Sequence, residues 1–198
     1  MASDKKGALK RSAKIAFLEA SGFSQKPSVR RTWAPRGKTP HIDIHFNWKR
    51  LKVIGSLVCE PEGEQADLLL HMQDKTIKED AIVDYLQALH KQVPGPIVLL
   101  WDHLSAHTGK KVATYLTANQ DWLTVEWFPG YAPELNPVEY VWSYAKDKPT
   151  ANSSPDTLGE IEDTLREMGK RLVSDQEIMY GFLEASKLYP QKEGRSLP

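Results

Sequence analysis

Residues 97–127, IVLLWDHLSAHTGKKVATYLTANQDWLTVEW, decide the fold class of this 198-residue chain. Five apolar residues, 97–101, have the length and composition of a buried strand and lead directly into Asp102. Residues 107–119 predict a helix, and residues 122–127 predict a second strand. A strand, a helix and a strand in this order form a parallel crossover unit, so we expect an α/β protein.

The residues before this unit predict further strands. Residues 15–18 form a short apolar run that ends at Glu19 and at a serine-glycine turn directly after it. Alternation of apolar and polar residues at 42–46, followed by a strand at 51–59, indicates an antiparallel meander. Residues 31–40 are rich in proline and glycine and predict a loop or hairpin. We therefore expect a mixed sheet.

The remaining segments predict helices. Residues 77–89 have helical spacing, begin after Thr76, which can cap a helix, and end before a Pro-Gly-Pro break. Residues 138–148 form a second helical stripe behind the proline-rich loop 128–137, in which Asn136 can cap the helix. After a short linker, amphipathic helices continue almost to the C-terminus.

Composition sets the size and class of the protein. Hydrophobic residues make up 40% of the chain, enough for one core of ordinary domain size. The single cysteine, Cys59, excludes an internal disulfide and a cysteine-rich zinc site. No apolar run approaches the ~20 residues of a membrane helix, and no secretion signal is recognisable. We expect a cytoplasmic protein.

The net charge of zero hides two opposed parts of the chain. Residues 1–52 carry 13 Lys and Arg against three acids; because the whole chain has 26 of each, the remainder carries −10. A basic region of this kind can bind the phosphates of a nucleic acid, although it can also be a solvated surface. Its candidate phosphate contacts are Arg30, Arg31, Arg36 and Lys38.

Three carboxylates occupy positions at which functional groups converge. Glu19 follows the first predicted strand, Asp102 follows a central strand, and Glu139 lies in the first turn of a helix. Carboxylate oxygens suit Mg²⁺ or Mn²⁺, and a pair of such ions catalyses phosphoryl transfer. The alternative is that these acids are helix caps and surface groups, because the helix dipole favours a glutamate in a first turn.

Two other groups of residues have a functional and a structural interpretation. His41, Asp43 and His45 would share one face of a strand and could bind zinc, or could simply form the polar face of an edge strand. Most of the six tryptophans are expected in the core. Trp33 is the exception, because it lies in the basic loop and could stack on a nucleic-acid base.

Four strings, in this order, resemble the catalytic domain of mariner-like bacterial insertion-sequence transposases, which are DDE superfamily endonucleases. They are RTWAPRGKTP at 31–40, VIGSL at 53–57, VLLWDHLSAH at 98–107 and FPGYAPELNPVE at 128–139, followed by Trp142 and Lys146. The resemblance covers roughly residues 14 to 148, and the proline-rich loop before Glu139 is its most specific part.

The resemblance implies a ribonuclease-H-like (retroviral-integrase-like) α/β fold with a mixed sheet flanked by helices and with C-terminal helices. It also implies a triad of acidic residues that holds two Mg²⁺ or Mn²⁺ ions, with Asp102 as its second member and Glu139 as its third. The 37-residue separation of these two acids fits this branch of the family. The proline-rich loop would aim Glu139 before the metals arrive.

The same resemblance implies a division of the chain and a set of partners. A basic segment (1–13) would precede the catalytic domain (14–149), and a helical appendage with a tail (150–198) would follow it. The DNA of transposon ends and target would be bound by the four basic residues above together with His107 and Lys146. A homodimer in a synaptic complex and a separately encoded helix-turn-helix half are the other expected partners.

The first catalytic position departs from the family pattern. Transposases of this type have Asp followed by Glu, Ser and Gly, whereas this chain has Glu19 followed by Ala, Ser and Gly. The extra methylene moves the carboxylate by about 1.5 Å, so we expect impaired cleavage and strand transfer. The alternatives are a catalytically silent remnant, a DNA-binding or dimerisation module of the same fold, and a repair or recombination nuclease.

Overall fold

A five-stranded sheet forms the centre of the molecule, with the strand order β3-β2-β1-β4-β5. The computed structural model describes residues 12–26, 28–43, 49–102 and 109–190. The first three strands are antiparallel neighbours, and the last two run parallel to β1, so the predicted mixed sheet is confirmed. The strands are β1 (Lys14–Ser24), β2 (Arg50–Cys59), β3 (Asp67–Gln73), β4 (Ile97–Trp101) and β5 (Leu123–Trp127).

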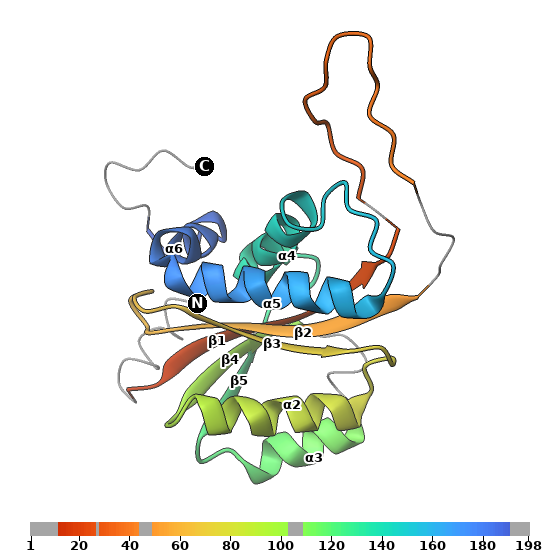
Figure 1. Ribbon diagram of the computed structural model, residues 1–198. Coiled ribbons are helices and arrows are strands. Elements are labelled where there is room, and N and C mark those ends of the chain that lie inside the picture. The colour runs from red at the N-terminus through yellow and green to blue at the C-terminus, as the bar shows by residue number, and fades with distance from the viewer. Residues whose placement is uncertain (1–11, 27, 44–48, 103–108, 191–198) are drawn as a thin grey trace.

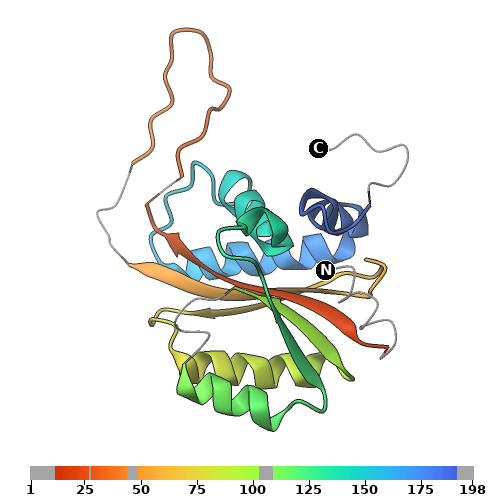
Figure 2. The same ribbon diagram turned by 180° about the vertical axis from the view of Figure 1, so that it is seen from behind.

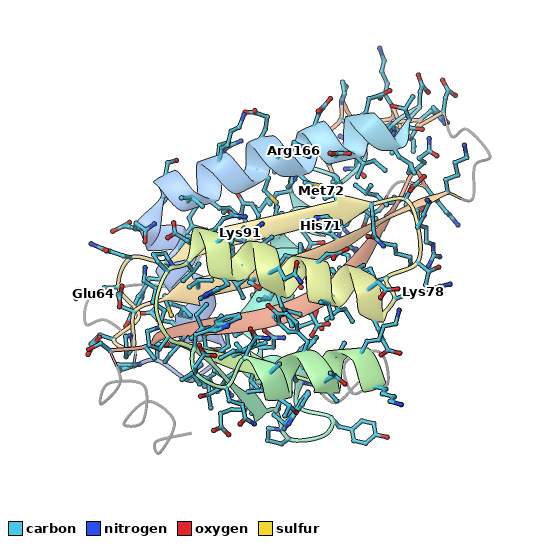
Figure 3. All side chains as sticks on the ribbon, turned by 90° about the horizontal axis from the view of Figure 1, so that it is seen from below. Glu64, His71, Met72, Lys78, Lys91 and Arg166 are labelled. Carbon is cyan, nitrogen blue, oxygen red and sulfur yellow. The ribbon has the colours of Figure 1, made fainter. Side chains whose placement is uncertain are left out.

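Helices cover both faces of this sheet (Figure 1). One layer holds α2 (Glu79–Gln92) and α3 (Lys110–Ala118), which lie side by side in Figure 3. The other layer holds α4 (Pro137–Asp147), α5 (Leu158–Ser174) and α6 (Gln176–Ala185), preceded by the 3₁₀ turn η1 (Pro133–Leu135). Among the described residues, no helix is long and apolar enough to cross a membrane.

The two helix layers explain the unbroken apolar runs of β1 and β4. Successive side chains of a strand point to opposite faces, so both sets must be apolar when both faces are covered. Ile15 and Phe17 enter the core beneath α4, α5 and α6. Ala16 and Leu18 enter the core formed with α2 and α3. On that second face, the His71 ring of β3 lies 6.4 Å from the Tyr85 ring of α2.

The structure corrects the expected boundaries at three places. The predicted serine-glycine turn is wrong, because β1 continues through Ser21 to Ser24 while paired with β2. Strand β3 was not predicted, since its apolar run is short and only half buried. Helix α2 begins at Glu79 after Lys78, so Thr76 does not cap it. The predicted boundary at 149/150 stays a prediction, and α5 and α6 pack on the same sheet as α4.

A long segment between β1 and β2 projects from the body of the protein (Figures 1 and 2). We call its described residues, 29–43, the arm. A turn closed by Lys38 N donating to Pro35 O at 3.0 Å confirms the predicted loop. The described part of the predicted strand at 42–46 is not a strand, and residues 44–48 lie outside the described residues.

The base of the arm is fastened to the linker between α4 and α5. Ser28 and Ala151 form a parallel bridge, and Asn152 N donates to Ser28 O at 3.0 Å. Arg30 N donates to Asn152 Oδ1 at 2.8 Å, and Arg30 Nε donates to Asp147 Oδ1 at 2.7 Å. These contacts set where the arm leaves the body.

Helix α4 approaches the sheet closely at a glycine. A Cβ atom built on Gly55 of β2 would lie 2.6 Å from Cη2 of Trp142 and 2.7 Å from its Cζ2. The Trp142 ring is buried and cannot move aside without disturbing the core. Gly55 is therefore required for the docking of α4 against β2.

We expect Gly55→Ala to lower the free energy of unfolding by about 2 kcal/mol, because the added methyl group displaces the Trp142 ring. Urea unfolding followed by circular dichroism measures this change. Gly181→Ala in α6 is the matched control: its Cβ meets nothing within 4 Å, so it should be neutral or stabilise by up to about 1 kcal/mol. Equal effects at the two sites would contradict the packing argument.

Candidate active site

Glu19 lies in the middle of β1, at the level where the neighbouring strand β4 ends. The parallel pairs run from Lys14 with Ile97 to Phe17 with Leu100, so two further residues bring Glu19 beside Asp102. Neighbouring strands are about 4.8 Å apart. Phe17 and Leu100 both project into the core beneath α4, and alternation places Glu19 and Asp102 on that same face.

The carboxylate of Glu19 is buried and is held by Asn136. Asn136 Nδ2 donates to Glu19 Oε2 at 3.0 Å and to Leu18 O at 3.3 Å. The other oxygen, Oε1, accepts from Ala20 N at 3.0 Å. Glu19 is 9% exposed and Asn136 is 2% exposed.

The same Asn136 side chain begins helix α4. Its Oδ1 accepts from Val138 N at 3.1 Å, which confirms the predicted cap, and Pro137 occupies the first helical position. Glu139 N donates to Asn136 O at 3.1 Å, and the Glu139 side chain is half-buried in the first turn. One amide thus connects the first candidate carboxylate to the helix start that carries the third.

The loop before α4 is held in a defined shape. Leu135 N donates to Ala132 O at 3.1 Å within η1, and Tyr140 Oη donates to Glu134 O at 3.2 Å. Tyr131 is fully exposed and has a φ of 58°, a conformation that costs a non-glycine residue free energy. The loop therefore presents an aromatic ring to solvent shortly before Glu139.

Lys146 extends the site along β1. Its Nζ donates to Ser21 Oγ at 3.0 Å and lies 5.6 Å from the centre of the Phe23 ring. Ser21 is two residues beyond Glu19 and so projects from the same face of β1. Lys146 is seven residues, or about two helical turns, after Glu139. The lysine and the carboxylates therefore share one face of the sheet.

The donor chemistry of this face fits a hard divalent cation, because Glu19, Asp102 and Glu139 offer only carboxylate oxygens. Within the described ranges, however, no three His, Cys, Asp or Glu side chains are gathered closely enough to hold a metal ion. This includes the described part of the alternative zinc group, His41 and Asp43. The three carboxylates are thus placed on one face without forming a closed metal cage.

The predicted phosphate contacts have different surroundings. The Arg30 guanidinium is paired with Asp147 at the base of the arm. Arg31, Arg36 and Lys38 are exposed along the arm, and the Trp33 side chain beside them is fully exposed. His107, like His103 and His45, lies outside the described residues.

Two features of the site were missed from sequence. The bond between Asn136 and Glu19 joins residues 117 positions apart, and that between Lys146 and Ser21 joins residues 125 apart. Local patterns identify a helix cap and a lysine but carry no signal for these partners. The only available clue was that Glu19 and Ser21 alternate on one predicted strand.

Comparisons with known proteins show the family and the fold of the chain. The family described as DDE superfamily endonuclease matches residues 14–162. Among solved structures, the chain is similar to a Mos1 transposase paired-end complex with the left transposon end, at 15% identity and a TM-score of 0.59. That match covers 94% of this chain and 60% of the Mos1 chain. No curated protein sequence matches the chain.

Two further structures support the fold. The Mos1 mariner paired-end complex with Mn matches at 14% identity and a TM-score of 0.61, covering 94% of this chain and 60% of that chain. The isolated catalytic domain of Mos1 mariner transposase matches at 12% identity and a TM-score of 0.54, covering 94% of this chain and 90% of that domain. The predicted ribonuclease-H-like fold is thereby confirmed.

We expect Asn136→Ala to lower the free energy of unfolding by about 2–4 kcal/mol, because it removes a helix cap and the amide donor to the buried Glu19 carboxylate. Thr157→Ala removes only an exposed cap, that of α5, and should cost about 1 kcal/mol in the same denaturation assay. Asn136→Asp keeps the cap acceptor but faces Glu19 with a second carboxylate, so it should destabilise more at pH 7 than at pH 4.5. An Asn136→Ala effect no larger than that of Thr157→Ala would contradict the bridging role.

Proposed function

Because the chain belongs to the DDE superfamily endonuclease family, we propose that it is a transposase catalytic domain that cuts and joins DNA strands at transposon ends. The observation that carries the proposal is the placement of the three carboxylates. Glu19 and Asp102 lie on adjacent strands of one face, and Asn136 ties Glu19 to the start of the helix that bears Glu139.

We propose Glu19, Asp102 and Glu139 as the ligands of two Mg²⁺ or Mn²⁺ ions. Solved structures of Mos1 similar to this chain include complexes with Mg and with Mn. Bound divalent ions would supply the charge that activates a water or a 3′-hydroxyl and stabilises the leaving oxygen. The protein contributes position: Asn136 orients the Glu19 carboxylate, and the loop before α4 limits where Glu139 can lie.

Reduced activity follows from the first carboxylate. With its extra methylene, the Glu19 side chain places Oε2 within hydrogen-bonding distance of Asn136 Nδ2. An aspartate at this position would hold its oxygens about 1.5 Å nearer the strand. This observation also favours the second candidate function, a catalytically silent remnant or a DNA-binding or dimerisation module of the same fold.

We propose transposon-end and target DNA as the partner of this face and of the arm. Exposed Arg31, Arg36 and Lys38 would contact backbone phosphates, as would Lys146 beside the carboxylates. We place His107 with them from the sequence resemblance. Arg30 would contribute less, because it is paired with Asp147.

The chain spans 60% of the length of the first Mos1 chains that it matches, so the wider assembly is also a proposal. Two copies would act together in a synaptic complex. A separately encoded helix-turn-helix half would recognise the end sequence, and the assembly would work on the bacterial nucleoid in the cytoplasm. Within the chain, we assign catalysis to residues 14–149 and leave 150–198 as a helical appendage.

Nicking of supercoiled plasmid in Mn²⁺ tests the catalytic proposal. We expect Asp102→Ala to lower the nicking rate by roughly 100-fold or more, because it removes a central metal ligand. Glu19→Asp should raise the rate by roughly 10- to 100-fold, because it restores the shorter reach of the side chain.

Asp121→Ala, which removes an exposed acid outside the candidate site, is the control and should leave the rate unchanged. If the Asp102→Ala variant nicks DNA at the original rate, the assignment as an enzyme is contradicted. The second candidate function, a DNA-binding module of the same fold, would then be favoured. A Glu19→Asp variant no faster than the parent would show that the methylene does not limit the reaction.

The arm is tested by reversing its charges. We expect Arg36→Glu combined with Lys38→Glu to weaken binding to a DNA duplex and to reduce the slope of log affinity against log salt by about 1.8, the value for two phosphate contacts. Lys110→Glu, an exposed lysine of α3, is the matched control for one charge reversal. Loss of affinity without a change of slope would count against direct phosphate contact.

A further inference from the structure

A pocket of about 430 Å³ opens at the root of the arm. Its walls come from the end of β1, the start of β2, the end of α4, the following linker and the first turns of α5. We call it the root pocket. Lys146 lines it, but none of the three candidate carboxylates does.

The charge of the root pocket is positive. Lys26, Arg50 and Lys146 line it, against one acid, Glu160. The Glu160 carboxylate is already used at the start of α5, where it accepts from Thr157 Oγ1 at 3.1 Å and from Asp156 N at 3.2 Å. No carboxylate of the described chain pairs with Lys26 or Arg50. The lining of the pocket therefore has more cations than acids.

Hydroxyl groups complete the lining. Ser154 Oγ is buried in the pocket wall, and within the described residues it has no hydrogen-bond partner. Ser24 Oγ accepts from Lys26 N at 3.1 Å, which leaves its own hydrogen available for an acceptor in the pocket. A buried hydroxyl without a partner is costly, and a ligand oxygen that bonded to Ser154 Oγ would remove this cost.

These donors match a phosphate group. A phosphate presents several oxygens, a guanidinium such as that of Arg50 can bind two of them, and hydroxyl donors satisfy the others. A carboxylate ligand would have fewer oxygens than the pocket has donors. The chemistry of the lining therefore favours a phosphate over a carboxylate.

The position of the pocket indicates which phosphate. Ser21 is two residues, about 6.6 Å, beyond Glu19 along β1, and Lys146 connects Ser21 to the pocket lining. A DNA strand held at the carboxylates would continue toward the root of the arm on the same face. Resting on the proposed function, we propose that the root pocket binds a backbone phosphate of this strand, a nucleotide or more away from the one that is cut.

The test measures DNA binding separately from cleavage. The full chain carrying Asp102→Asn, without divalent ions, is titrated with a duplex in which single phosphates are replaced by neutral methylphosphonates. At one position, the replacement should weaken binding about tenfold. Arg50→Gln should weaken binding by a similar factor, reduce the salt slope by about 0.9, and remove the effect of that one replacement.

Lys91→Gln on the α2 layer is the matched control and should leave affinity and slope unchanged. Ser154→Ala should lower affinity while raising the melting temperature of the free protein, because it removes a buried hydroxyl without a partner. Because binding is read without cleavage, failure of the nicking assay does not affect this result.

Additive effects of Arg50→Gln and of every methylphosphonate would overturn the proposal. So would an Arg50→Gln variant that loses stabilisation by inorganic phosphate but binds DNA as the parent does, since the pocket would then hold a free ion. If Arg50→Gln fails to fold, Arg50→Lys replaces it in the test. Because lysine keeps the charge but cannot bind two oxygens as a guanidinium does, Arg50→Lys should retain the salt slope but lose part of the affinity.

Discussion

The buried amide of Asn136 is the interaction on which the candidate site depends. With one side chain it donates to the carboxylate of Glu19 and to the backbone of β1, and it accepts from the first turn of α4. An amide can do this because it carries donors on one atom and acceptor sites on the other. The sheet that bears two carboxylates and the helix that bears the third are thereby joined where the chemistry is expected.

The packing around this amide holds α4 against the sheet. Gly55 pairs with Glu19 in the antiparallel register and leaves space for the Trp142 ring. Trp142 in turn contacts Phe23, with the ring centres 5.9 Å apart. Near the end of α4, Lys146 donates a hydrogen bond to Ser21 of β1. The packing of Trp142 against Gly55 and the cap at Asn136 thus hold α4 against one face of the sheet.

The distribution of charge gains a spatial meaning in the folded chain. Among the described cations of the basic N-terminal third, Arg31, Arg36 and Lys38 are exposed on the arm, which extends from the body, whereas Lys26 and Arg50 line the root pocket. Arg30 also lies in the arm, but it is paired with Asp147 and fastens the base of the arm to the body. A run of basic residues in a sequence can therefore contain both ligand-binding and structural members.

The sequence by itself determined the strand-helix-strand unit, the helix cap at Asn136 and the family, because these depend on neighbouring residues and short motifs. It could not determine where β1 ends, since Ser21 and Gly22 read locally as a turn, whereas pairing with β2 extends the strand to Ser24. Nor could it identify the partners of Glu19 and Lys146, which come from more than 100 residues away. Only the tertiary structure decided these features, because strand register and helix docking bring distant residues together, and local propensity does not encode that proximity.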